Sequence, residues 1–124
     1  MSTRRRWMAL LGGCLLAVAL ASPAEAADKV YRVGFLGARF RSTPDHPDIY
    51  YDGWLSAMRD LGYVEGKNLL IEWRFADGHY ERLPGLAAEL AAMKLDVVVT
   101  HGLRPTLELQ KATSVTPIVS AVLV

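Results

Sequence analysis

The chain contains very little cysteine and histidine. Its 124 residues include one Cys and three His. A single thiol excludes an intramolecular disulfide framework, and it excludes a zinc site built from several cysteines. The three histidines, at positions 46, 79 and 101, lack the close spacing that metal ligands have. We therefore expect neither a metal nor another cofactor.

An excess of charge of either sign is also missing. Fourteen Lys and Arg against 13 Asp and Glu give a formal net charge of +1. Nucleic-acid binding needs a concentrated basic surface that displaces counterions, so this balance argues against such a partner. Hydrophobic residues make up 52% and charged residues 22% of the chain, which excludes a disordered protein. The length suits one domain or part of a larger one.

Catalytic signatures are absent from the sequence as well. There is no nucleophile-elbow motif and no Gly-rich phosphate loop, and Gly34 and Gly37 do not form a dinucleotide fingerprint. We therefore do not expect an enzyme. Two alternatives stay open at this point: an exported α/β enzyme that uses His101, Asp77 and nearby arginines, and a flavodoxin-like module.

Residues 1–26 have the layout of a cleaved secretory signal. Three arginines at 4–6 precede an apolar stretch from Trp7 to about Ala21, and a small-x-small triplet at 24–26 follows it. The apolar stretch spans about 15 residues, fewer than the roughly 20 that a membrane-spanning helix needs. This favours a signal over an anchor, and it predicts a periplasmic protein.

Two shorter patterns in the signal leave the export route open. Residues 3–8 resemble a twin-arginine signal, although any basic start of a signal shares this feature. Residues 11–14 faintly resemble a lipoprotein cleavage box that ends at Cys14. Only about seven apolar residues precede Cys14 and more follow it, so we interpret Cys14 as a passive member of the apolar stretch.

Strand-like and helix-like segments alternate through residues 27–124. Apolar and β-branched runs predict strands at 30–37, 69–75, 97–100 and 118–122. Helical spacing of apolar residues predicts helices at 48–61, from about 80–84 to 93, and at 105–112. This order predicts an α/β fold, a doubly wound parallel sheet of strand order 2-1-3-4 with right-handed crossovers.

The predicted fourth strand lies at the end of the chain with nothing after it to cover the sheet. We therefore expect residues 27–124 to be an incomplete, truncated domain. Bare apolar surface on that strand would make the isolated chain poorly soluble or self-associating.

Five segments, taken in order, carry a resemblance to a known family. They are residues 31–36, 61–69, 77–90, 96–100 and 111–119. They resemble the start of bacterial ABC transporter substrate-binding proteins, in the subfamily that includes tryptophan/tyrosine-type receptors, and the resemblance covers residues 30–122. It implies the N-terminal lobe of a type 1 periplasmic binding protein. Such a protein closes two lobes around a small ligand and delivers it to an ABC permease.

Ligands of doubly wound sheets bind at the carboxyl ends of the strands. They bind near the switch point, where the strand order reverses, which lies here between strands 1 and 3. The predicted ligand-binding residues therefore follow these two strands: Gly37, Ala38, Arg39, His101, Gly102 and Arg104. With Pro105 as the first helical residue, Arg104 would be the helix N-cap. There it would attract an anion together with the helix amides, or it would simply be solvated.

For several of these residues a structural role competes with a ligand contact. Gly37 and Gly102 either let the backbone come close to a ligand or are needed only for a turn. Arg39 and Arg41 line the cleft or keep a loop soluble, and His101 contacts ligand or donates within its loop. Residues 50, 51 and 54 form an aromatic shelf or, as helical spacing favours, pack in the core. We expect His46 and His79 to face solvent and Asp77-Gly78 to form a turn.

Two loops depart from the pattern of the family. Residues 38–47 form a longer and more basic loop than is usual after the first strand. Residues 101–105 follow the third strand, at the place where the family commonly has a run of small residues. Both lie at the expected binding edge, so the resemblance does not transfer a ligand identity.

Overall fold

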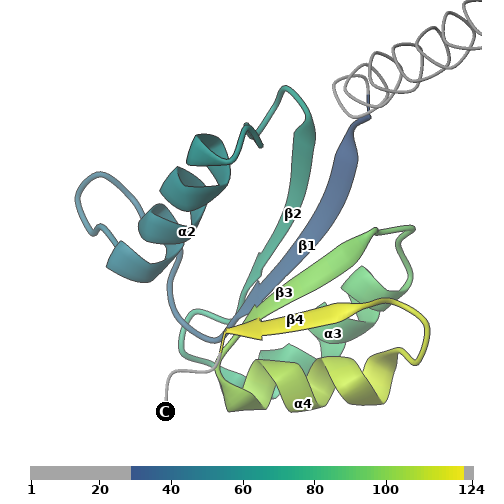
Figure 1. Ribbon diagram of the computed structural model, residues 1–124. Helices are drawn as coiled ribbons and strands as arrows, with labels where there is room; N and C mark the ends of the chain where they lie inside the picture. The colour runs from purple at the N-terminus through teal and green to yellow at the C-terminus, as the bar shows by residue number, and fades with distance from the viewer. Residues whose placement is uncertain (1–28, 122–124) are drawn as a thin grey trace, which may run out of the picture.

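The computed structural model describes residues 29–121, which contain one four-stranded parallel sheet (Figure 1). The strand order β2-β1-β3-β4 confirms the prediction. The strands are β1 (Tyr31–Gly37), β2 (Leu69–Phe75), β3 (Val97–His101) and β4 (Ile118–Ala121). The predicted signal and Val122, the predicted end of the last strand, lie outside the described residues. Within residues 29–121, no helix has the length and apolarity to cross a membrane.

Helices lie on both faces of the sheet, as a doubly wound fold requires. Figure 1 shows α2 (Ile49–Asp60) on one side, and α3 (Leu83–Ala91) and α4 (Leu103–Ala112) together on the other. A short 3-10 helix, η1 (Tyr80–Arg82), leads into α3. Because strand side chains alternate, Leu36 of β1 packs with the core of α3 and α4, and Phe35 packs with that of α2.

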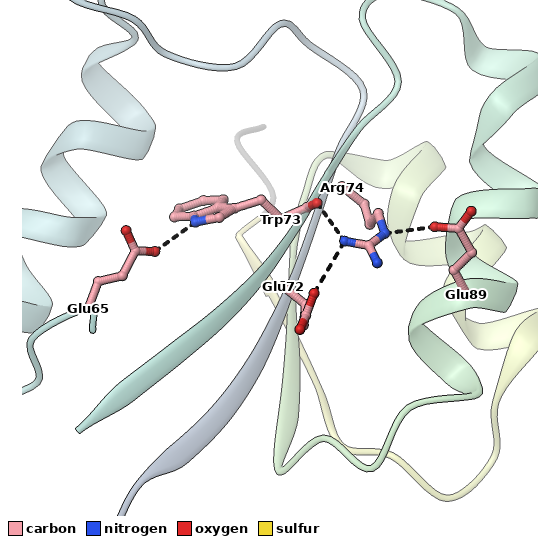
Figure 2. Close-up of polar contacts among 5 residues, drawn as sticks. All are labelled: Glu65, Glu72, Trp73, Arg74 and Glu89. Carbon is pink, nitrogen blue, oxygen red and sulfur yellow. Dashed lines mark hydrogen bonds and ion pairs between the residues drawn. The ribbon is translucent and has the colours of Figure 1, made fainter. Parts of the chain in front are cut away.

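Polar contacts on two consecutive residues tie the edge strand β2 to its surroundings (Figure 2). Trp73 Nε1 donates a hydrogen bond to Glu65 Oε2 in the turn after α2, at 2.7 Å. Arg74 Nε donates to Glu89 Oε2 of α3, also at 2.7 Å. Arg74 Nη1 donates to the Trp73 carbonyl at 2.9 Å and lies 3.5 Å from Glu72. These contacts tie the carboxyl end of β2 to the turn after α2 and to α3.

Two helices begin at positions that differ from the predictions. α2 begins at Ile49 because Asp48 is its N-cap. The prediction that Arg104 caps α4 and that Pro105 begins it is wrong, because Gly102 is the N-cap. Gly102 has φ 100° and ψ 162°, which favours glycine, and its carbonyl accepts the first helical hydrogen bond from Thr106. Pro105 then occupies the third helical position, where a backbone N–H has no helical partner to lose.

Candidate functional site

The carboxyl ends of the strands form a single row across the sheet. Gly37 pairs with Phe75 on one side and with His101 on the other, and His101 pairs with Ala121. The structure thereby brings together five of the six predicted site residues. We call this group the switch edge: Gly37, Ala38, Arg39, His101 and Gly102.

Asp48 connects the loop after β1 to the start of α2. It is 8% exposed, and its Oδ1 accepts a hydrogen bond from the Tyr50 N–H at 3.0 Å. Its Oδ2 forms an ion pair with Arg39. The Arg39 guanidinium also lies 5.2 Å from the centroid of the Tyr50 ring, a cation–π distance. Arg39 is therefore placed by two partners, although half of its side chain stays exposed to solvent.

Two buried side-chain atoms at this edge have no hydrogen-bond partner within residues 29–121. They are Tyr51 Oη and His101 Nε2. The Tyr51 ring packs edge-on against Phe35 and His101, with centroids 5.0 Å and 5.7 Å away. A Cβ at position 37 would lie 2.6 Å from Tyr51 Oη, so only glycine leaves room for the hydroxyl. Gly37 thus serves the packing of Tyr51 as well as the end of β1.

Both of these groups are uncharged near neutral pH. Burial raises the pKa of Tyr51 to about 12, and Asp48 adds to this rise while Arg39 opposes it. Burial also lowers the pKa of His101, with Arg39 lowering it further and Asp48 opposing. Tyr51 and His101 therefore place two neutral polar groups beside the Arg39–Asp48 ion pair, whose two charges compensate each other.

A pocket of about 350 Å³ opens beside the switch edge. Its size falls at the lower end of the range for sites that bind small organic molecules. Most of its lining comes from the segment between β1 and α2: Ala38, Arg39, Phe40, Arg41, His46, Pro47 and Asp48. Gly78 and Tyr80, which follow β2, complete the lining. Phe40 and Tyr80 are 68% and 52% exposed, so this pocket offers aromatic surface to a solute.

Arg104 is the predicted site residue that does not join the switch edge. It is the second residue of α4, and its exposed guanidinium lies 5.3 Å from the centroid of the Tyr80 ring. Arg104 therefore neighbours a lining residue of the pocket without lining it itself. Arg41 does line the pocket, and its guanidinium lies 5.8 Å from the centroid of the Trp73 ring.

The other expected placements are mostly confirmed. His46 and His79 are exposed, and Asp77 and Gly78 form a turn with φ values of 53° and 79°. Tyr51 packs in the core as the helical spacing favours, and Tyr50 stays partly exposed. No group of three or more metal-ligating side chains is found in the described part of the chain.

Sequence reasoning missed Asp48 and Tyr80 as site residues. The N-cap role of Asp48 could have been predicted, because Asp immediately before a helix is a preferred N-cap. Its ion pair with Arg39 could not be predicted from the local sequence. The position of Tyr80 could not be predicted either, since Tyr80 reaches the pocket only through the turn that joins β2 to α3.

No protein-family model and no curated protein sequence matches the chain. The solved structures that are similar to it include three described here, and the chain spans 30% of the length of each. One is the ligand-free, open form of a substrate-binding protein with adhesive properties from Clostridium difficile. Its TM-score is 0.64, with 20% identity over 73% of this chain.

The second is a conserved domain protein from Vibrio cholerae, with a TM-score of 0.65 and 26% identity over 74% of this chain. The third is an ABC domain from Streptococcus pneumonia in complex with L-Trp, with a TM-score of 0.64 and 20% identity over 75% of this chain. These similarities confirm the fold that the sequence resemblance implied. The described residues have the α/β architecture of one lobe of an ABC-type substrate-binding protein.

Proposed function

We propose that this chain is the solute-binding component of an ABC importer, and that it is a receptor and not an enzyme. Residues 1–26 direct its export, with cleavage after Ala26. In the periplasm it captures a small organic solute, amino-acid-like in character, and delivers it to a permease in the inner membrane.

The observation that carries the proposal is the switch edge. Five residues at the ends of two inner strands or directly after them meet there beside an open pocket, at the place where doubly wound sheets bind their ligands. Two of the similar solved structures support a binding role: one is named a substrate-binding protein and the other holds L-Trp.

The described residues can contact a solute from one side only. Half-enclosure leaves much of the solute in water, so we expect the chain by itself to bind weakly. Closure of a second lobe over the pocket would supply the remaining contacts and the conformational signal for a permease.

Two-dimensional NMR on the ¹⁵N-labelled chain tests the proposal, with L-tryptophan as the first probe and other amino acids after it. Weak binding is visible in such spectra at millimolar solute. We expect saturable shifts at the amides of the switch edge and of the pocket loop, because these groups line the proposed contact surface.

Arg39→Ala should weaken this binding because it removes a polar side chain that lines the pocket. Arg59→Ala is the matched control, since Arg59 is an exposed arginine in the last turn of α2, at the opposite end of that helix from Asp48. Saturable shifts confined to the opposite end of the sheet, or none with any amino acid, would refute the proposed function.

A further inference from the structure

We propose that the Tyr51 hydroxyl and His101 Nε2 together bind an uncharged polar group of the solute, one that can both donate and accept a hydrogen bond. A primary carboxamide or a hydroxyl has this chemistry. The inference rests on the proposed function, and it names the kind of group that the switch edge would select.

The two atoms belong to one location in the fold. His101 ends β3 and pairs in register with Gly37, which ends β1. Tyr51 Oη lies over Gly37, in the space that a Cβ would otherwise fill. The Tyr51 and His101 rings are in contact, with centroids 5.7 Å apart. Both atoms therefore flank the switch point where a solute is expected to bind.

Their lack of partners sets them apart from the other buried polar side chains of the described residues. Asp48 bonds to a backbone N–H and to Arg39, and the hydroxyls of Thr100 and Thr106 bond to each other at 2.7 Å. An unpaired buried polar group costs stability, and folded proteins rarely keep one without a reason. Two unpaired buried polar atoms at one switch point indicate that a ligand can form hydrogen bonds there.

An uncharged group suits this location better than an anion. The tyrosine hydroxyl donates one hydrogen bond and accepts others, and a neutral imidazole nitrogen donates or accepts according to its tautomer. The nearest cation, Arg39, is already paired with Asp48. An incoming carboxylate would meet the Asp48 charge and find few donors, whereas a carboxamide offers both a donor and an acceptor.

We expect a solute to reach this location from the His101 side, after a movement of the Tyr50 side chain. Tyr50 lies against His101, with ring centroids 5.4 Å apart, and Arg39 lies over Tyr50. Tyr50 is 43% exposed and the Arg39 side chain is 49% exposed, so both side chains have room to rotate into solvent. A planar solute would then take the place of the Tyr50 ring beside His101.

Benzamide and benzoate make a matched pair of probes, because they share a ring and differ in whether the polar group is neutral or anionic. We expect benzamide to shift the Tyr51 ring and His101 imidazole resonances in a saturable way, and benzoate to do so at least about fivefold more weakly. Tyr51→Phe should weaken benzamide binding by about fivefold, the loss expected for one hydrogen bond.

Tyr63→Phe is the control, since Tyr63 packs on the same α2-side core but against Tyr31, at the other end of β1. Tyr51→Phe should also keep or raise the melting temperature, because it removes a buried group that lacks a partner. A fall in melting temperature would show that the hydroxyl is already satisfied, for example by a buried water, and would overturn the inference.

Equal benzamide affinity in Tyr51→Phe, preference for benzoate, or no benzamide binding would each overturn it as well. The proposed function is judged separately by the amino-acid titration. Saturable binding of L-tryptophan at the switch edge, combined with any of these outcomes, would leave the receptor proposal standing and remove only the role of Tyr51 and His101.

Discussion

Gly37 and Tyr51 constrain each other at the end of β1. The hydroxyl of Tyr51 occupies the space beside the Gly37 Cα, and Tyr51 as a residue is 2% exposed within an aromatic cluster. Sequence spacing predicted a core position for Tyr51. It carried no information about where the hydroxyl would lie, because that depends on a strand separated from α2 by the whole first loop.

Burial of Tyr51 leads to a prediction about alkaline pH. The chain has five tyrosines, and we expect Tyr51 to ionise near pH 12 because burial raises its pKa from 10.0 to about 12. Between pH 10 and 12 the folded state keeps a proton that the unfolded state has lost, so stability falls as pH rises. The total loss is on the order of 3 kcal/mol, from about 1.36 kcal/mol per pKa unit.

Absorbance at 295 nm measures this titration, and Tyr51→Phe should abolish the step near pH 12. If the folded protein showed no step near pH 12, the burial of the Tyr51 hydroxyl would be wrong.

At the scale of elements, three hydroxyls connect α4 to the sheet. Thr106 Oγ1 lies 2.8 Å from the Gly102 carbonyl, 2.7 Å from Thr100 Oγ1 and 2.8 Å from Ser120 Oγ. A carbonyl can only accept, so the single Thr106 proton goes to Gly102, and Thr100 and Ser120 donate to Thr106. This network holds the first turn of α4 against β3 and β4, directly behind the switch edge.

Thr106→Val preserves the shape of the side chain but removes the centre of this network. The Thr100 hydroxyl is then left unpaired at a fully buried position, and we expect a loss of about 1–3 kcal/mol in the free energy of unfolding. Urea denaturation measures the loss. Ser56→Ala on exposed α2 surface is the control, and an equal, small effect of the two variants would argue against the network.

The start of α4 shows the limit of local rules for helix ends. Pro105 indicated a start at 105, since proline is common at the first helical position. The helix begins two residues earlier because Gly102 reverses the chain directly after β3, with a positive φ. Proline loses no helical hydrogen bond at the third position either, because the first N–H groups of a helix have no partner within it. The sequence alone therefore did not distinguish the two starts.

For the whole molecule, the sheet order predicts a gradient of stability. β1 and β3 are inner strands, paired on both sides, whereas β4 is a short edge strand with mostly exposed residues. We expect native-state hydrogen exchange to be slowest in the middle of β1 and fastest, among the strands, in β4. Exchange in β4 as slow as in β1 would indicate that another surface covers β4 in solution.

The expectation that residues 27–124 form an incomplete domain stays a prediction, as does cleavage of the signal after Ala26. The similar solved structures are longer than this chain, which spans 30% of each. The same exchange experiment bears on self-association, since a second copy seated on β4 would slow its amides in a concentration-dependent way.

The sequence by itself determined the strands, the alternation of strand and helix and the sheet order, and it predicts the edge at which a solute would bind. These follow from local periodicity and from the handedness of crossovers, which act within short segments. Only the tertiary structure decided that Tyr51 and Asp48 of the α2 region meet Gly37, Arg39 and His101, and that Arg104 does not. Those contacts join segments distant along the chain, and packing in three dimensions selects them.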